Sequence, residues 1–285
     1  MTSQPAVDPI HFSASLAPAE VELSVRDLAR SVAFYREVLG LQVRSHTSHR
    51  AELGTAERPL IVLHALDNPQ PPQRSTGLYH LALLLPGRAD LGRFLKHVSD
   101  LGLRVGASDH LVSEAIYLND PDGHGIEVYR DRLRSEWPQV DGQLVMATDP
   151  LDAAGVLGSS EGTVWTGLPS GTVMGHIHLK VSDQQTATAF YQLIGFELTV
   201  QFLGASFLSA GGYHHHLGLN VWESRAAPAP AEDTPALRRA HFQLSRDDLA
   251  GLKERLQSAG LPFEEGESFA DLTDPAGNQL RFSVN

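Results

Sequence analysis

The sequence predicts an α+β protein built from four βαβββ units, and three observations lead to this fold class. The pattern that begins at Glu20 returns at His176, an offset of 156 residues, or about half of the 285-residue chain. Each half contains a second copy of the same order of strands and helix. Each second copy closes with an Asp-Pro turn and a strand, at 119–129 and at 273–284. Self-similarity of this kind indicates a duplicated unit.

The first unit is expected over residues 19–66. Its opening strand shows the period-2 alternation of a half-buried strand and ends at Asp27. A helix carrying Phe34-Tyr35 follows, and Gly40 separates it from the next strand. We interpret Tyr35 as a core residue, because the Phe-Tyr pair recurs with the periodicity of a helix.

The second unit is expected over residues 77–131. A strand that contains His80 precedes the helix ADLGRFLKHVSDLGL, and the unit closes with DPDGHGIEVY at 120–129. Asp-Pro followed by a Gly turn is typical of a hairpin, and the alternation after it predicts a strand. We interpret Asp120 and Asp122 as turn-forming residues rather than metal ligands.

A connector is expected between the two halves. A chain of this length usually holds two domains, and we place them at 1–131 and 172–285 with the connector at 132–171. The connector is rich in Gly, Ser, Asp and Pro and weakly periodic, with one short helix predicted at 151–157. None of its residues is predicted to be catalytic.

The third and fourth units are expected over 173–223 and 237–284. Unit three repeats the strand, the Asp and the helical Phe-Tyr pair of unit one, so Tyr191 is also interpreted as a core residue. Unit four joins the strand around His241 to the helix DDLAGLKERLQSAGL and closes with TDPAGNQLRFSV. The Ala/Pro-rich stretch at 223–236 is interpreted as the loop between these units.

Composition excludes several classes of partner and site. Lys and Arg number 22 against 34 Asp and Glu, a net charge of −12 without a basic run, so neither nucleic acid nor a membrane is expected as a partner. No apolar run approaches the length of a membrane span, and the N-terminus lacks the features of a secretory signal, so a cytoplasmic protein is expected. The chain has no Cys, which excludes disulfides and thiolate sites, whereas its 14 His leave a metal site of nitrogen and oxygen open.

Four motifs carry a family resemblance. They are TGLYHLALLLP (76–86), DPDGHGIEVY (120–129), GHIHLKVSD (175–183) and SAGGYHHHLGLN (209–220). In this order, inside a four-unit repeat, they resemble the vicinal oxygen chelate superfamily of glyoxalase I, bleomycin-resistance proteins and type I extradiol dioxygenases. Within it they are most similar to the bacterial catechol-2,3-dioxygenase family. The resemblance implies that the units pair into two cup-shaped, eight-stranded sheets.

The resemblance also implies a metal held by residues on the first and last strands of paired units. Unit four has Arg281 where unit two has the carboxylate Glu127, and a cation there should repel a metal. Units one and two would offer only one imidazole. Units two and three together offer two His and one carboxylate, the ligand set of non-haem Fe(II) oxygenases. We therefore predict that units two and three share a cup and bind the metal. The first-strand positions compared are Glu20, His80, His176 and His241, and the predicted ligands are His80, Glu127 and His176.

Three consecutive imidazoles, His214 to His216, are predicted to begin the strand HLGLNVW. The resemblance implies a proton-shuttling His here, and an imidazole suits that role because its pKa lies near working pH. His215 aligns best, and His216 replaces it if the register slips by one residue. Alternation predicts His214 and His216 on one face and His215 on the other. A surface strand without catalytic function is the alternative.

Further residues are candidates for the same site. The resemblance implies a substrate-contacting Tyr at Tyr117, although a buried core Tyr is equally compatible with the sequence. His110 could reach the cup from the preceding strand. His178 shares the face of His176 in a regular strand and is a candidate for lining the site. His241 stays open as a ligand.

The function that the resemblance implies is an Fe(II)-dependent extradiol dioxygenase of aromatic catabolism. Its partners are a small aromatic diol of the catechol type and O₂, and Mn(II) or another divalent metal is the alternative cofactor. A glyoxalase-type lyase or isomerase with Zn, Ni or Mn would need a fourth protein ligand. A metal-free protein that binds an aromatic ligand is the third function considered. The sequence leaves a homo-oligomer open.

Overall fold

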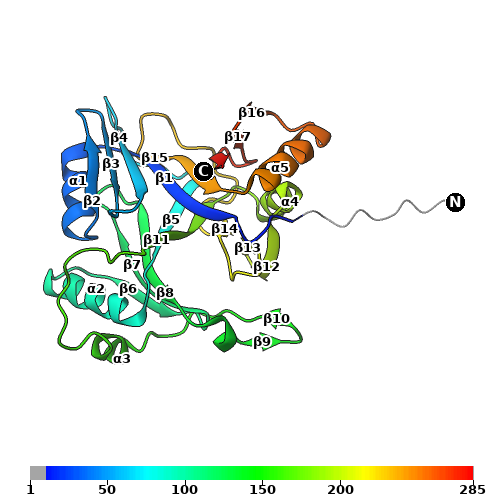
Figure 1. The fold of residues 1–285 in the computed structure, drawn as a ribbon. Coiled ribbons are helices and arrows are strands. Elements are labelled where there is room, and N and C mark those ends of the chain that lie inside the picture. Colours follow the sequence, from blue (N-terminus) through cyan, green and yellow to red (C-terminus); the bar gives the residue numbers. More distant parts are fainter. Residues whose placement is uncertain (1–10, 285) are drawn as a thin grey trace.

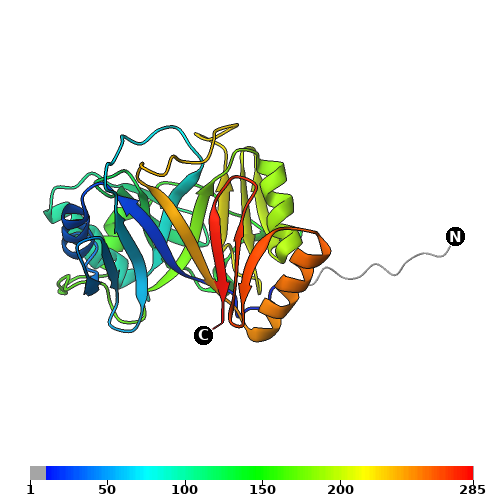
Figure 2. The same ribbon diagram turned by 90° about the horizontal axis from the view of Figure 1, so that it is seen from above.

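The computed structural model describes residues 11–284 and confirms the predicted α+β fold with two eight-stranded sheets (Figure 1). We call these sheet I and sheet II. The views in Figures 1 and 2 both place helices α1 and α2 toward one end of the molecule and α4 and α5 toward the other. Within the described residues, no helix is long and apolar enough to cross a membrane.

Sheet I is formed by units one and four. Its strand order is β16-β17-β18-β15-β1-β4-β3-β2, with β1 and β15 antiparallel at the centre. The strands are β1 (Ala17–Val25), β2 (Gln42–His46), β3 (Arg50–Gly54), β4 (Pro59–Ala65), β15 (Ala236–Gln243), β16 (Phe263–Gly266), β17 (Phe269–Thr273) and β18 (Gln279–Ser283).

Sheet II is formed by units two and three, which confirms the predicted pairing of these units. Its strand order is β12-β13-β14-β11-β5-β8-β7-β6, with β5 and β11 antiparallel at the centre. The strands are β5 (Gly77–Leu84), β6 (Gly106–Asp109), β7 (Ser113–Asn119), β8 (Gly125–Asp131), β11 (Val173–Lys180), β12 (Glu197–Phe202), β13 (Ala205–Ser209) and β14 (Leu217–Asn220).

Each unit contributes one helix, and the connector contributes one more. The repeated Asp of units one and three is an N-cap, since Asp27 accepts the backbone N–H of Arg30 and Asp183 accepts that of Thr186. The α-helices are α1 (Leu28–Glu37), α2 (Arg88–Asp100), α3 (Ala153–Gly158), α4 (Gln184–Ile194) and α5 (Arg246–Ser258). The connector also holds the 3₁₀ turn η1 (Arg134–Glu136) and the short strands β9 (Gln139–Val140) and β10 (Gln143–Leu144).

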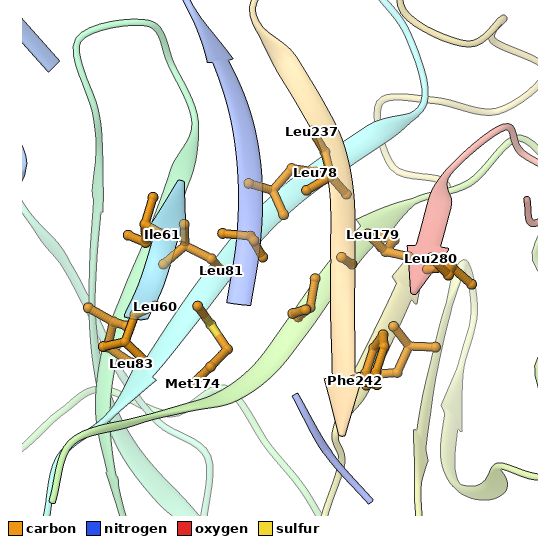
Figure 3. Close-up of a cluster of buried hydrophobic side chains, with 14 of the residues drawn as sticks. Leu60, Ile61, Leu78, Leu81, Leu83, Met174, Leu179, Leu237, Phe242 and Leu280 are labelled. Atoms are coloured by element: carbon orange, nitrogen blue, oxygen red, sulfur yellow. The ribbon is translucent and has the colours of Figure 1, made fainter. Parts of the chain in front are cut away.

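Apolar side chains from both sheets meet in one buried core. Figure 3 shows Leu81 and Leu83 of sheet II in a cluster with Ile61 and Leu237 of sheet I. Successive residues of a strand point to opposite faces. The residue between the two leucines, Ala82, therefore belongs to the other face of β5, as does His80. This alternation turns the functional face of sheet II away from the core.

The Asp-Pro segment of unit two forms a turn, as predicted, and its Asp120 and Asp122 side chains are buried. One carboxylate oxygen of Asp120 accepts the backbone N–H groups of Asp122 and His124 at 2.8 and 2.9 Å. The other accepts the hydroxyl of Tyr35 at 3.1 Å. Tyr35 is fully buried in the core, so its hydroxyl ties unit one to unit two.

Removing that hydroxyl should destabilise the fold. In Tyr35→Phe the ring still packs, but the buried carboxylate of Asp120 loses one donor. We expect the free energy of unfolding to fall by about 1–3 kcal/mol, measured by urea denaturation. Tyr191→Phe should act similarly, because Tyr191 donates to Asp274 at 2.9 Å in the other half. Unchanged unfolding midpoints in both variants would show that these bonds are energetically neutral.

Candidate metal centre

One row of residues across sheet II brings the predicted ligands together. The register pairs His176 on β11 with Ala82 on β5, Ala82 with Glu127 on β8, and Glu127 with Tyr117 on β7. Residues paired in this way share a face of the sheet. The methyl group of Ala82 leaves space above it, so the longer side chains of His176 and Glu127 can approach each other there. His80 lies two residues away on the same face of β5.

The donor atoms of these three residues converge. His80 Nε2 lies 3.3 Å from His176 Nε2, and each lies 3.1 Å from Glu127 Oε2. Three ligands about 2.1 Å from an octahedral metal, at right angles, are about 3 Å apart. All three residues are buried, and among residues 11–284 they are the one group of His, Asp and Glu with this spacing. The donor set therefore fits a divalent metal.

The electrostatics of the group suit a cation. Burial alone would raise the pKa of Glu127, but the neighbouring His176 and His80 hold that pKa well below its usual range. Burial lowers the pKa of His176 more than Glu127 raises it. The carboxylate is therefore ionised and the His176 imidazole neutral, which are the protonation states that metal binding requires.

A cavity of about 460 Å³ opens beside the three residues. This volume is in the range of small-molecule sites. Aromatic rings and polar groups line it together, and His80 and Glu127 form part of its wall. Other lining residues include Tyr79, His110, Tyr117, Met146, Ala147, Thr148, His178, Lys180, Phe202, Phe207, His215, Trp222 and Glu223.

The sequence reasoning missed part of this wall. The connector was expected to have no catalytic residue, yet Met146, Ala147 and Thr148 line the cavity. Phe202, the last residue of β12, and Trp222, just after β14, were also not predicted. No local pattern marks these residues, because their role depends on where the connector and the hairpin ends fold against sheet II.

Tyr117 and His110 lie at the cavity as a bonded pair. His110 Nδ1 donates to the carbonyl oxygen of Ala147 at 2.7 Å, which leaves Nε2 to accept the Tyr117 hydroxyl at 2.6 Å. Burial, followed by the charge of Glu127, raises the pKa of Tyr117 well above its usual value. The hydroxyl therefore stays protonated and can act as a hydrogen-bond donor.

The run of three imidazoles precedes the strand that it was predicted to begin. Strand β14 starts at Leu217, and residues 213–216 are irregular. The alternation of a regular strand therefore does not apply to the three residues, and His214 Nδ1 and His215 Nδ1 lie 2.7 Å apart. The His215 ring lines the cavity, with its centroid 4.2 Å from that of His176. His216 is turned toward the end of β13, and the backbone N–H of Ala210, the residue after that strand, donates to its Nδ1.

His178 lines the cavity, as the strand pattern indicated. Asn220 donates from its side-chain nitrogen to His178 Nε2 at 3.0 Å. A Cβ atom at Gly218 would lie 2.7 Å from the His178 ring and would clash with it. The ring can occupy this position because residue 218 has no side chain.

His241 lies in sheet I, outside the cavity. The sequence analysis treated His241 as the counterpart of His80. The strand register shows that its counterpart is Ala82, two residues further along β5. His241 is paired with Arg281 in the way that Ala82 is paired with Glu127. His241 instead bonds to Glu22, at 2.8 Å.

The buried imidazoles should make the metal-free protein sensitive to acid. Burial, and then the charges of nearby groups, lowers the pKa of His216 to about 3. In the unfolded chain His216 is protonated below about pH 6.5, whereas in the folded chain it stays neutral down to about pH 3. The free energy of unfolding therefore falls as the pH drops from about 6.5 toward 3. Each such His contributes up to about 1.4 kcal/mol per pH unit.

We therefore expect the unfolding free energy to be lower at pH 5 than at pH 7, and the decline to be shallower in His216→Gln. Urea denaturation of the metal-free protein at a series of pH values measures both. Equal slopes for the variant and the wild-type protein would contradict the assignment.

Comparison with known proteins places this site in a family context. The model of the Glyoxalase/Bleomycin resistance protein/Dioxygenase superfamily matches residues 17–128 and 173–282. The chain is 43% identical over 273 residues to a Bacillus subtilis (strain 168) protein named catechol-2,3-dioxygenase, covering 92% of this chain and 95% of that protein.

Two solved structures show how widely the fold is shared. Glyoxalase I from Zea mays matches with a TM-score of 0.58 and 13% identity, over 95% of this chain and 92% of that chain. The cppA protein from Streptococcus pneumoniae TIGR4 matches with a TM-score of 0.55 and 15% identity, over 98% of this chain and 100% of that chain. At these identities the likeness concerns the fold alone.

Proposed function

The chain belongs to the glyoxalase/bleomycin resistance protein/dioxygenase superfamily, and on that premise we propose that it is an Fe(II)-dependent extradiol ring-cleaving dioxygenase. Its substrates are O₂ and a small aromatic diol of the catechol type. Both oxygen atoms of O₂ enter the product, and the ring bond that breaks lies beside the diol. The identity to a protein named catechol-2,3-dioxygenase supports the substrate class.

The observation that carries this proposal is the convergence of two imidazoles and one carboxylate beside the cavity, with His80 and Glu127 in its wall. Two imidazoles and one carboxylate are the ligand set of non-haem Fe(II) oxygenases. A bound Fe(II) would supply Lewis-acid and redox chemistry between the diol and O₂. His80, Glu127 and His176 would hold it.

The chain supplies the proton chemistry. We assign His215 as the base that takes a proton from a diol hydroxyl and returns it later, since its ring faces the cavity. The Tyr117 hydroxyl, held by His110, stabilises negative charge on a substrate oxygen by donating a hydrogen bond. Aromatic walls such as Tyr79 and Phe207 exclude water and pack on the ring.

The same geometry counts against the other two functions. A glyoxalase-type lyase or isomerase needs a fourth protein ligand, commonly a second carboxylate. Among the cavity-lining residues the carboxylates are Glu127 and Glu223, and only Glu127 lies with the two histidines. A metal-free binding protein would keep a buried carboxylate at a cost in stability without using it.

Anaerobic reconstitution tests the proposal. The purified protein is loaded with Fe(II), mixed with catechol and exposed to air while O₂ uptake and absorbance are followed. A yellow ring-fission product formed with one O₂ per catechol is expected. A protein that binds Fe(II) stoichiometrically yet gives no yellow product with catechol or alkyl catechols would overturn the proposal. Turnover of the methylglyoxal–glutathione adduct would favour the lyase.

A further inference from the structure

A chain of hydrogen bonds leads from His215, at the cavity wall, to a carboxylate behind it. His215 Nδ1 lies 2.7 Å from His214 Nδ1, and His214 Nε2 lies 2.8 Å from Asp131 Oδ1. His214 is fully buried. Asp131 is the last residue of β8, four residues after Glu127. Neither His214 nor Asp131 lines the cavity, so neither touches a bound substrate.

The carboxylate end determines the direction of these bonds. An ionised carboxylate only accepts hydrogen bonds, so His214 Nε2 must carry a hydrogen and donate it to Asp131. His214 lies close to other imidazoles, with its ring centroid 4.6 Å from that of His215 and 6.4 Å from that of His176. A single hydrogen on each of the two rings is enough to make both bonds. The neutral ring then has a lone pair at Nδ1.

The same reasoning fixes the next ring. Because His214 Nδ1 is an acceptor, His215 Nδ1 must carry the hydrogen that lies between them. A neutral His215 then has its lone pair at Nε2, and this atom makes no hydrogen bond within residues 11–284. We propose that Asp131 and His214 are positioning residues that hold His215 in the tautomer whose Nε2 lone pair faces the cavity.

The surroundings hold the carboxylate in place. The Tyr213 hydroxyl donates to the second oxygen of Asp131 at 2.9 Å, and the Tyr129 hydroxyl lies 2.9 Å from that of Tyr213. A Cβ atom at Gly175 would lie 1.9 Å from the Tyr129 hydroxyl and would clash with it. The residue before His176 must therefore be Gly for the hydroxyl to occupy this position. The Trp137 ring packs against His214 with centroids 5.2 Å apart.

The arrangement has a consequence for turnover, which rests on the proposed function. When a diol hydroxyl gives its proton to His215 Nε2, the ring becomes an imidazolium with hydrogens on both nitrogens. The positive charge of this imidazolium is stabilised by the hydrogen bond from its Nδ1–H to His214 and by the bond from His214 Nε2–H to Asp131. Both of these hydrogens stay on their own rings, so no proton is transferred to Asp131. The opposite tautomer would present Nε2–H to the substrate and could not accept a proton. This is the role that the buried Asp has in a Ser-His-Asp triad.

The tautomer can be measured without turnover. Long-range ¹H–¹⁵N spectra of the full-length protein, with histidines labelled and diamagnetic Zn(II) added, distinguish protonated from unprotonated ring nitrogens. The His215 signals are assigned by their loss in His215→Gln. We expect an unprotonated Nε2 and a protonated Nδ1 on His215, and the reverse on His214. A protonated Nε2 on His215, or two protons on His214, would overturn the inference.

Two substitutions at one position test the effect on turnover. His214→Phe keeps the packing against Trp137 but removes both nitrogens, so the tautomers of His215 should mix. We expect kcat to fall about 10- to 100-fold while KM and metal content stay within about twofold. His214→Gln can donate to Asp131 and accept from His215, so it should restore most of kcat. His64→Phe, in sheet I, is the matched control and should leave kcat unchanged.

The outcomes separate this inference from the proposed function. If the wild-type protein does not open catechols but shows the expected tautomers, the proposed function fails and the assignment of the positioning residues stands. If His214→Phe mixes the tautomers yet turns over catechol at the wild-type rate, the positioning role is refuted although the dioxygenase function holds. Equal losses of kcat in the Phe and Gln variants would show a packing role only.

Discussion

Glu127→Ala is expected to abolish metal binding by this protein. The carboxylate is the one anionic member of the group, and both imidazoles converge on the same oxygen at 3.1 Å. Without it, a divalent cation would be held by two neutral ligands in a buried site. We expect the affinity for Fe(II) or Mn(II) to fall more than about 100-fold, measured by anaerobic equilibrium dialysis and metal analysis. Turnover should be lost with the metal.

A matched control exists in sheet I. Glu22 also lies between two imidazoles, but His64 and His241 bond to different oxygens of it, each at 2.8 Å. These donors do not converge on one point, so Glu22→Gln should leave the metal content unchanged. If Glu127→Ala folds normally and keeps its metal, while Glu22→Gln loses it, the metal centre has been assigned to the wrong sheet.

His215→Ala is expected to separate metal binding from turnover. His215 lies beside His176 but is not among the three convergent donors. The variant should therefore keep its metal and still bind catechol. Its turnover should fall about 10²–10⁴-fold, the usual scale of general acid–base catalysis. By contrast, His80→Ala and His176→Ala should lose both metal and turnover.

His216→Ala is the comparison for that experiment. His216 belongs to the same run, but its ring is bonded toward Ala210 and lies outside the cavity wall. We expect its kcat to stay within a few-fold of the wild-type value. Slow turnover of His216→Ala together with full activity of His215→Ala would assign the proton transfer to His216. Normal activity in both variants would remove the proton carrier from the proposed mechanism.

The sequence by itself predicted the repeated units and their helices, and the family resemblance together with the candidate ligands predicted the pairing of units two and three. The spacing of apolar residues along the sequence indicates which face of a strand is buried. The repeated pattern indicates which segments of the four units are equivalent. Because opposite charges are needed to hold a cation, Arg281 in unit four already argued against a metal site there. Units two and three remained as the pair that offers His80, Glu127 and His176.

The tertiary structure decided what depends on register and on loops. His241 was placed two residues from its true counterpart, because spacing along the chain does not report how far one strand slides past another. The connector residue Ala147 became a partner of His110 only because the connector folds back over sheet II. His214 and His215 bond to each other because β14 begins after them. Sequence patterns record which residues are buried and which repeat, whereas contacts between distant segments follow from packing the whole chain.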